Sequence, residues 1–273
     1  AVLLAMLTIV ALGWRMRPHP TPPPPNGLRI VMLDVGQGDG ILLQTKAGSV
    51  LVDEGPPEAN VASQLRALGV RRLAALVVTH PHRDHVGGAA EVVDSLPVGF
   101  VLDPLEPTDS PDEAALQHEA RARGVRVVAA RVGETFTLDA LRIRVLWPDG
   151  PGLRDEDPHE HGAVLLASYG QFDALLTGDS ESAVTLPLHP PQVELLKVAH
   201  HGSSDTGLGE LLEAIRPKIA LISVGEGNDY GHPAPSTLSA LAASPGLAVY
   251  RTDEDGRVTV ESDGTTFSVR TQR

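Results

Sequence analysis

Residues 79–88 read THPHRDHVGG and directly follow an apolar run. The stretch holds three histidines and one aspartate within six residues. His80 and His82 occupy alternate positions, so both can point to one side of an extended turn, while Asp84 and His85 point to another. Imidazole and carboxylate groups at this spacing suit two adjacent divalent ions such as Zn²⁺ or Mn²⁺. A strand that ends in clustered histidine and aspartate indicates a metal site rather than a polar surface turn.

The segments on both sides of this stretch alternate between strand and helix patterns. The apolar run at 73–78 predicts a strand buried on both faces. The pairs 41–45 with 49–53 and 163–169 with 173–177 predict hairpins around short turns that contain glycine. This interleaving favours a layered α/β structure with mixed sheets. Further strands are expected at 28–33, 125–129, 141–147, 193–199, 219–224, 248–252 and 257–261, and helices at 60–68, 112–123, 208–215 and 236–243.

The composition excludes several classes of protein. The 273 residues include 11 His and no Cys, which rules out disulfides, thiolate zinc sites, iron–sulfur clusters and a cysteine nucleophile. The formal net charge is −13, from 22 Lys and Arg against 35 Asp and Glu. Because duplex binding usually needs a basic face, this acidic balance argues against a protein that holds nucleic acid by charge alone.

The first residues differ from the rest of the chain. Residues 1–14 are apolar apart from one threonine, and Arg15 and Arg17 follow. Fourteen residues are too few to cross a bilayer, which takes roughly 20. We therefore expect the end of a longer transmembrane helix, with a signal-peptide core or a buried helix of the globular domain as alternatives. The expected organisation is an apolar segment at 1–17, a stiff Pro-rich linker at 18–27 and one domain at 28–273.

Four more motifs accompany the histidine stretch in a fixed order. DVGQGD stands at 34–39, before the histidines, and LTGD at 176–179, KVAHHGS at 197–203 and YGHP at 230–233 come after them. This ordered set resembles the metallo-β-lactamase superfamily. It is most similar to the metallo-β-lactamase-like domain of the ComEC family of bacterial competence DNA-uptake proteins.

The resemblance runs from about Leu28 to the C-terminus and implies a fold. That fold is a four-layer αββα sandwich with two mixed β-sheets. It also implies two divalent metal ions, with His80 and His82 on the first and Asp84 and His85 on the second. Asp179 would bridge the two ions, although Gly-Asp-Ser-Glu is also an ordinary start for a helix and both roles are compatible.

The two later motifs supply further candidates. The resemblance makes His232 the final ligand of the second ion, whereas alone Gly-His-Pro would be a turn with a solvated histidine. It also implies that a histidine at His200 or His201 protonates the leaving oxygen. Neighbours on an extended segment face opposite ways, so only one of the two is expected to reach the substrate, while the other holds the loop or contacts a metal. Ser203 offers a hydroxyl to a phosphate, or to an ordinary capping turn.

The chain departs from the superfamily pattern in two places. Most members carry a third histidine on the first metal, ahead of the hairpin that leads to the Gly-Asp turn; here residues 159–162 read HEHG. His161 is the candidate extra ligand, and a solvated loop histidine is the alternative. Asp53 is followed by Glu54 where the superfamily has threonine, yet it can still orient a ligand histidine. Asp34 and Asp39 are expected beside the metals or the substrate.

These parts predict a two-metal phosphodiester hydrolase with Asp84, His200 and His201 as catalytic candidates. Two divalent ions lower the pKa of water to around 7 and clamp the phosphate oxygens. By resemblance the substrate is DNA, expected to be single-stranded and delivered by a membrane channel, and the activity is a nuclease that degrades the strand not imported. The alternatives are a catalytically weak accessory module that binds metal, and a hydrolase of another ester or lactam.

Two signals for the location of the domain conflict. Arg15 and Arg17 would place it in the cytoplasm by the positive-inside rule. The resemblance implies the outer face of the membrane instead. Because the charges that precede the apolar segment are missing from the sequence, we expect a membrane-associated domain on the extracytoplasmic side.

Overall fold

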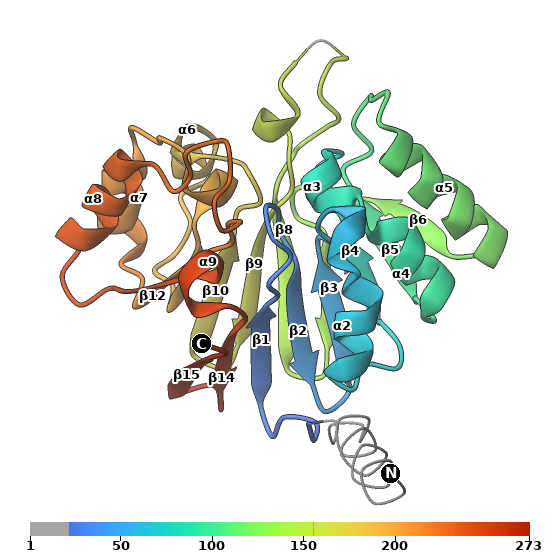
Figure 1. Ribbon diagram of the computed structural model, residues 1–273, viewed down its shortest axis with the longest axis horizontal. Coiled ribbons are helices and arrows are strands. Elements are labelled where there is room, and N and C mark those ends of the chain that lie inside the picture. Colours follow the sequence, from blue (N-terminus) through green and yellow to red (C-terminus); the bar gives the residue numbers. More distant parts are fainter. Residues whose placement is uncertain (1–21, 155) are drawn as a thin grey trace, which may run out of the picture.

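The computed structural model describes residues 22–154 and 156–273, arranged as two β-sheets packed face to face between layers of helices (Figure 1). The apolar segment expected at 1–17 and the start of the Pro-rich linker lie outside the described residues. Within the described ranges, no helix combines the length and apolar character that a membrane span requires.

The first sheet has eight strands in the order β15-β14-β1-β2-β3-β4-β5-β6. Pairing is parallel from β3 to β6 and antiparallel elsewhere, so the sheet is mixed. The strands are β1 (Leu28–Met32), β2 (Ile41–Thr45), β3 (Gly48–Val52), β4 (Ala75–Val77), β5 (Phe100–Asp103), β6 (Arg126–Ala129), β14 (Val258–Ser262) and β15 (Phe267–Thr271).

The second sheet has seven strands in the order β13-β12-β11-β10-β9-β8-β7. Here β10 to β13 are parallel and β7 to β10 antiparallel. The strands are β7 (Thr135–Leu138), β8 (Leu141–Trp147), β9 (Val164–Tyr169), β10 (Phe172–Leu176), β11 (Leu195–Lys197), β12 (Ile219–Ile222) and β13 (Ala248–Arg251).

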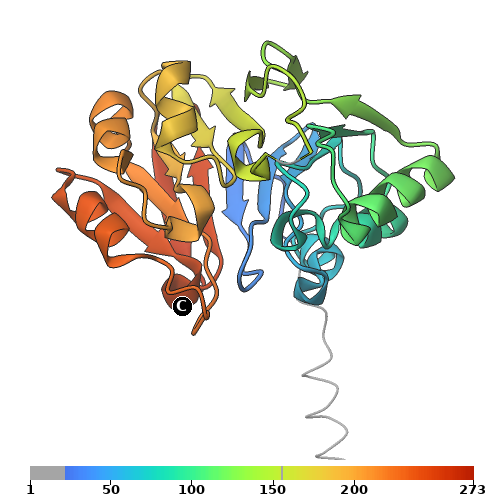
Figure 2. The ribbon, with the colours of Figure 1, turned by 90° about the horizontal axis from the view of Figure 1, so that it is seen from above.

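Helices cover the outer face of each sheet, as the view from above shows (Figure 2). The first sheet is covered by α2 (Val61–Ala67), α4 (Ala89–Ser95) and α5 (Pro111–Arg123), and the second by α7 (Leu208–Ile215) and α8 (Pro235–Ala243). The short helices are α3 (Arg83–Val86), α6 (Ser182–Thr185) and α9 (Thr252–Asp255), with 3₁₀ turns η1 (Pro57–Ala59), η2 (Pro158–Glu160), η3 (Leu186–Leu188) and η4 (Ala199–Gly202).

Three apolar cores hold these layers together. On β2, Ile41 and Leu43 face the core between the sheets, whereas Leu42 faces the helices outside. On α7, Leu211 and Ile215 face the outer core of the second sheet. Each such side chain contributes about 1.5–3 kcal/mol when fully buried. The structure thus confirms the expected αββα sandwich with two mixed sheets.

The fold brings the motif loops to one edge of the sandwich. Parallel strands of both sheets end at this edge, so the loops that follow β4, β10, β11 and β12 meet there (Figure 1). The strand expected at 193–199 is shorter than predicted, because the chain leaves β11 at Lys197 and turns into η4. That early turn decides how two of the motif histidines point.

Candidate metal centre

The histidine stretch forms a loop after β4 and then the single turn of α3. His80 is fully buried in the loop, and Asp84 and His85 lie on α3. The backbone N–H of Asp39 donates to the carbonyl of Asp84 at 3.0 Å. Gly38 has a φ of +134°, and a Cβ there would lie 2.2 Å from that same carbonyl oxygen. The DVGQGD motif therefore requires glycine at this position so that its loop can pack against α3.

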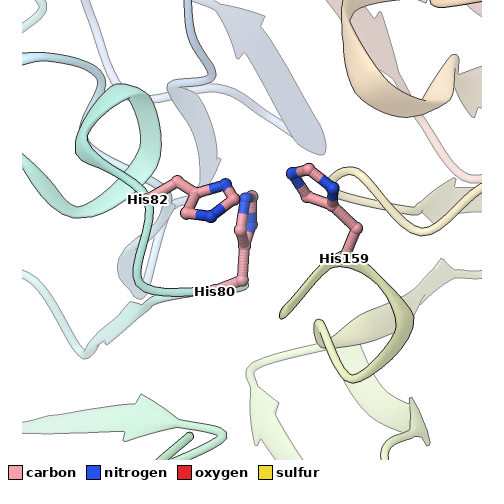
Figure 3. A group of neighbouring side chains, drawn as sticks. All are labelled: His80, His82 and His159. Atoms are coloured by element: carbon pink, nitrogen blue, oxygen red, sulfur yellow. The ribbon is translucent and has the colours of Figure 1, made fainter. Parts of the chain in front are cut away.

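Three imidazoles converge at the first of three clusters of metal-type ligands, which we call the histidine group: His80, His82 and His159. A further cluster, formed by His159, Asp179 and His200, shares members with its neighbours. Their rings point toward one another from the loop after β4 and from η2 (Figure 3). The ring centroids of His82 and His159 are 4.6 Å apart. Ser180 fixes η2 by donating its hydroxyl to the carbonyl of His159 at 2.8 Å, and the His159 Nδ1 lies 3.0 Å from Asp157.

The third histidine of this group is His159 and not the expected His161. The His161 Nε2 lies 3.0 Å from the Glu156 carboxylate, and its ring stacks toward Trp147 at the far side of the turn. Successive residues of a 3₁₀ turn are rotated by about 120°, so side chains two positions apart diverge. The sequence motif HEHG places both histidines in this turn, and only the backbone conformation distinguishes them.

The second cluster, which we call the mixed group, consists of Asp39, His85, Asp179 and His201, all buried. The His85 Nδ1 lies 2.8 Å from an oxygen of Asp53, which directs the Nε2 of His85 toward Asp179 at 3.2 Å. Thr79 donates both its backbone N–H and its hydroxyl to Asp53 at 2.7 Å. Asp53 thus lies behind the His85 ring, in the orienting position expected for it.

Asp179 joins the two groups at the centre of the site. Its Oδ1 faces the Nε2 of His85, and its Oδ2 lies between His201 of the mixed group and the imidazoles of the histidine group. Gly178 before it has a φ of +52°, and a Cβ there would lie 2.9 Å from Thr79. The Oδ2 lies 3.8 Å from the Nε2 of His80, 3.7 Å from that of His159, 3.9 Å from that of His200 and 3.6 Å from that of His201.

Both histidines of the HHGS motif lie at the site, with His201 inside the mixed group, and only the expected extended backbone of this segment is wrong. His200 and His201 have φ values of 50° and 53°, so the segment is a left-handed turn rather than an extended strand. The buried His201 has its Nδ1 3.0 Å from the Ser223 carbonyl and its Nε2 3.2 Å from Asp84. His200 is 29% exposed and lies with its Nδ1 3.3 Å from Glu181.

Several other expected residues lie near the site without joining either group. His232 is not a member of the mixed group, in which His201 stands instead. The His232 ring lies at the rim of the site, with its centroid 5.6 Å from that of His200. Asp84 contacts His201 from outside the group. Ser203 donates its hydroxyl to Glu181, and Asp34 pairs with Arg273 at 3.3 Å away from the metal-type ligands.

Lys197 is a buried cation that the sequence analysis did not single out. Its ammonium is fully buried, donates to the Gly178 carbonyl at 2.7 Å and pairs with Asp39. It also lies 3.7 Å from the Oδ1 of Asp179. A lysine is seldom buried unless a carboxylate accompanies it. Its position in the apolar strand LLK therefore indicates a buried acidic partner.

The two groups differ in the protonation of their histidines. Burial lowers the pKa of His80 well below its usual value and also lowers the pKa of His82 and His159. Burial acts in the same direction on His201, but the charge of Asp179 and hydrogen bonds to Asp39 and Asp84 outweigh it and raise its pKa to about 9.

The pKa values of Asp84 and His85, both on α3, are set by neighbouring charges that outweigh burial. Burial alone would raise the pKa of Asp84, yet the hydrogen bond from His201 and the charge of His85 lower it to about 2. Burial also lowers the pKa of His85, but Asp179 and Asp53 outweigh this effect and raise it well above its usual value. Burial would also raise the pKa of Asp39 and Asp179, but the charges of Lys197 and His85 lower it, so the mixed group holds charged acids beside charged imidazoles.

The donor atoms fit divalent metal ions. The buried Nε2 of His80 has no hydrogen-bond partner, which is costly unless a cation is bound. Two ligand atoms at about 2.1 Å from one tetrahedral ion are separated by roughly 3.4 Å. The separations of 3.2–3.9 Å around Asp179 are close to that value. The donors are nitrogen and oxygen only, which suits Zn²⁺ or Mn²⁺.

A cleft of about 210 Å³ opens above this centre. It exposes His200 and the carboxylate of Asp84, so a substrate in the cleft would contact both groups. The lining residues are Gln37, His82, Asp84, His159, Asp179, His200, His201, Tyr230 and His232.

Comparison with known proteins agrees with this arrangement. Residues 33–226 match the model of the metallo-beta-lactamase superfamily. The chain is 30% identical to ComE operon protein 3 of Bacillus subtilis over 83% of its own length, and 29% identical to competence protein ComA of Neisseria gonorrhoeae over 94%. It spans 32% and 37% of these two relatives, about a third of their length.

A solved structure supports the fold independently. The metallo-beta-lactamase fold protein YhfI of Bacillus subtilis superimposes with a TM-score of 0.56 at 15% identity, and the match covers 82% of this chain and 96% of that protein. Such low identity establishes the architecture alone. Together with the matched family model and the clusters of metal-type ligands, it shows that the chain belongs to the metallo-β-lactamase superfamily of metal-dependent hydrolases, with competence proteins among its homologues.

Proposed function

We propose that the chain hydrolyses phosphodiesters with two divalent ions, one in the histidine group and one in the mixed group. The position of Asp179 carries this proposal, because this single buried carboxylate lies within 3.2–3.8 Å of imidazoles from both groups. Bound ions would lower the pKa of water and neutralise charge on the phosphate. His80, His82 and His159 would hold one ion, and His85 and His201 with Asp179 the other.

The protein's own side chains would orient the substrate and move the proton. His200 is the exposed histidine of the cleft, and Glu181 contacts its Nδ1 at 3.3 Å, which leaves the Nε2 to face the cleft. We assign to His200 the donation of a proton to the leaving oxygen. Ser203 donates to the same Glu181, so it holds the partner of His200 rather than the phosphate itself.

The substrate we propose is single-stranded DNA delivered by a membrane channel, as in degradation of the strand that is not imported. This proposal is supported by the competence proteins among the relatives. With a net charge of −13, the chain is expected to attract DNA only weakly in solution. A position beside a membrane channel would bring the strand to the cleft without electrostatic attraction. We further propose that the domain is membrane-associated and extracytoplasmic.

Replacement of Asp84 tests the activity. We expect wild-type protein to cleave end-labelled single-stranded DNA with Mn²⁺ or Zn²⁺, and Asp84→Asn to retain its fold and lose cleavage. The matched control is Asp34→Asn, which removes a carboxylate paired with Arg273 away from the metal-type ligands. If the wild type fails to cleave DNA with either metal, the role of a metal-binding accessory module is favoured. Rapid turnover of a chromogenic β-lactam would instead favour a lactam hydrolase.

A further inference from the structure

The rim of the cleft carries an aromatic side chain that the proposed chemistry does not use. Tyr230 lies in the loop 225–232 that follows β12, and its side chain is 72% exposed. Four large apolar or aromatic side chains are exposed among residues 22–154 and 156–273, and of these Tyr230 alone lines the cleft. A tyrosine with this exposure contributes little to the apolar core, so its ring is available to contact a substrate in the cleft.

Hydrogen bonds hold this loop in one conformation. The Oδ1 of Asn228 accepts from the backbone N–H groups of Tyr230 and His232, both at 3.1 Å. The Nδ2 of Asn228 donates to the carbonyls of His232 at 2.7 Å and Gly225 at 3.0 Å. Gly225 in turn donates to the side chain of Gln37 at 3.1 Å, which ties the loop to the DVGQGD motif. The backbone that carries the ring is therefore ordered before any substrate arrives, which lowers the entropic cost of binding.

The surroundings of the ring indicate what it contacts. Tyr230 stacks on His232, with an interplanar angle of 30° and centroids 6.0 Å apart. This pair forms a platform at the edge of the cleft, and His232 links it to His200 across 5.6 Å. The loop contains Glu226 and Asp229 and no lysine or arginine, so it repels a phosphate and suits an uncharged planar ring.

We infer that Tyr230 and His232 form a stacking subsite for the nucleobase next to the scissile phosphate. This inference rests on the proposed function and adds strand preference to it. In a duplex the faces of the bases are covered by their neighbours, whereas a single strand can turn one base onto an aromatic ring. The subsite therefore selects single-stranded substrate without reading its sequence.

The test compares two strands and three variants of the metal-loaded protein. One strand is an ordinary labelled oligonucleotide, and the other has the same backbone with abasic units in place of the nucleotides. Tyr230→Ala should lower kcat/KM on the ordinary strand by about 10- to 100-fold, mainly through KM. It should leave cleavage of the abasic strand unchanged. Tyr230→Phe keeps the ring and should retain wild-type values, as should Val132→Ala, an exposed residue that does not line the cleft.

A binding measurement separates this inference from the proposed function. Fluorescence anisotropy with phosphorothioate strands of both kinds reports affinity without cleavage. Equal affinity of wild type and Tyr230→Ala for the ordinary strand would overturn the stacking subsite, even if cleavage is active. Base-dependent binding that is lost in Tyr230→Ala, from a wild type that cleaves neither strand, would instead support the subsite and overturn the proposed hydrolysis.

Discussion

The histidine group and the mixed group both contact Asp179, yet their imidazoles differ in protonation and therefore in readiness to bind a metal ion. The histidine group contains three imidazoles whose pKa values burial lowers, so they are neutral near pH 7. In the mixed group, carboxylates raise the pKa values of His85 and His201, so both imidazoles carry protons. A metal ligand must be deprotonated. The first group can therefore accept an ion directly, whereas the second must first release protons.

Lys197 extends this contrast. Its ammonium pairs with Asp39 inside the mixed group, so one carboxylate of that group is already neutralised by a cation of the protein. The histidine group has no lysine or arginine among the ion pairs of its three described side chains. The two groups therefore differ both in ligand type and in local charge, so we expect them to bind divalent ions with unequal affinity.

The largest effect is expected when the shared carboxylate is removed. Asp179→Asn takes a charged ligand from both groups, so both ions should bind more weakly and cleavage should fall by more than the about 100-fold that an outer partner of a ligand costs. Metal content by mass spectrometry and single-turnover cleavage check this. Asp173→Asn, on β10 but outside both groups, is the control. If Asp179→Asn retains one tightly bound ion, the two groups do not share this ligand.

Two histidines of one turn provide the next test. His159→Ala should remove the ion of the histidine group and lower activity by at least about 100-fold, the upper limit for an outer partner, since a direct ligand is lost. His161→Ala removes only a contact with Glu156, and its activity and metal content should match the wild type. The paired variants differ by two positions in sequence, so each controls for the other. Loss of metal and activity in His161→Ala but not in His159→Ala would instead identify His161 as the ligand.

An outer partner of the mixed group should have a smaller effect. Asp53→Asn keeps the shape of the side chain but weakens the hold on the Nδ1 of His85, so metal affinity of the mixed group should fall by about 10- to 100-fold. Affinity of the histidine group should change little. Stepwise Mn²⁺ titration by calorimetry distinguishes the two binding events, and equal weakening of both would contradict their separation.

The smallest effect is the difference in pH dependence. The pKa of His201 is raised to about 9, so its proton competes with metal at pH 7 and is lost as the pH rises through that value. Affinity of the mixed group should therefore increase with pH, by about tenfold per unit for each displaced proton. Affinity of the histidine group should stay nearly constant above pH 7. Calorimetry in buffers of different ionisation enthalpy counts the released protons, and none released by the second ion would refute the contrast.

The sequence was sufficient where ligands are consecutive and insufficient where a turn sets their direction. The alternation of apolar runs predicted the layered fold, and residues 79–88 marked the site because their side chains come from one loop. The choice between His159 and His161 depended on a 3₁₀ turn that the letters do not specify. Likewise the left-handed backbone of His200 and His201 turned both rings inward, against the rule for an extended strand.

Elements were missed for a related reason. Strands β5, β7 and β15 and helix α4 were not predicted, because each is short or partly polar and gains its stability from neighbours. Lys197 was overlooked since its sequence neighbours indicate only a buried strand, and its partner Asp39 is 158 positions away. Local sequence patterns do not predict contacts between loops that are distant in sequence and meet at one sheet edge.

The most direct measurement is the rate of single-stranded DNA cleavage as Mn²⁺ bound per chain rises from zero to two. The histidine group should fill first at pH 7, because its imidazoles are already neutral. Two groups that act together through Asp179 predict almost no cleavage up to one ion per chain and a steep rise between one and two. Full activity at one ion, or none at two, would contradict the account.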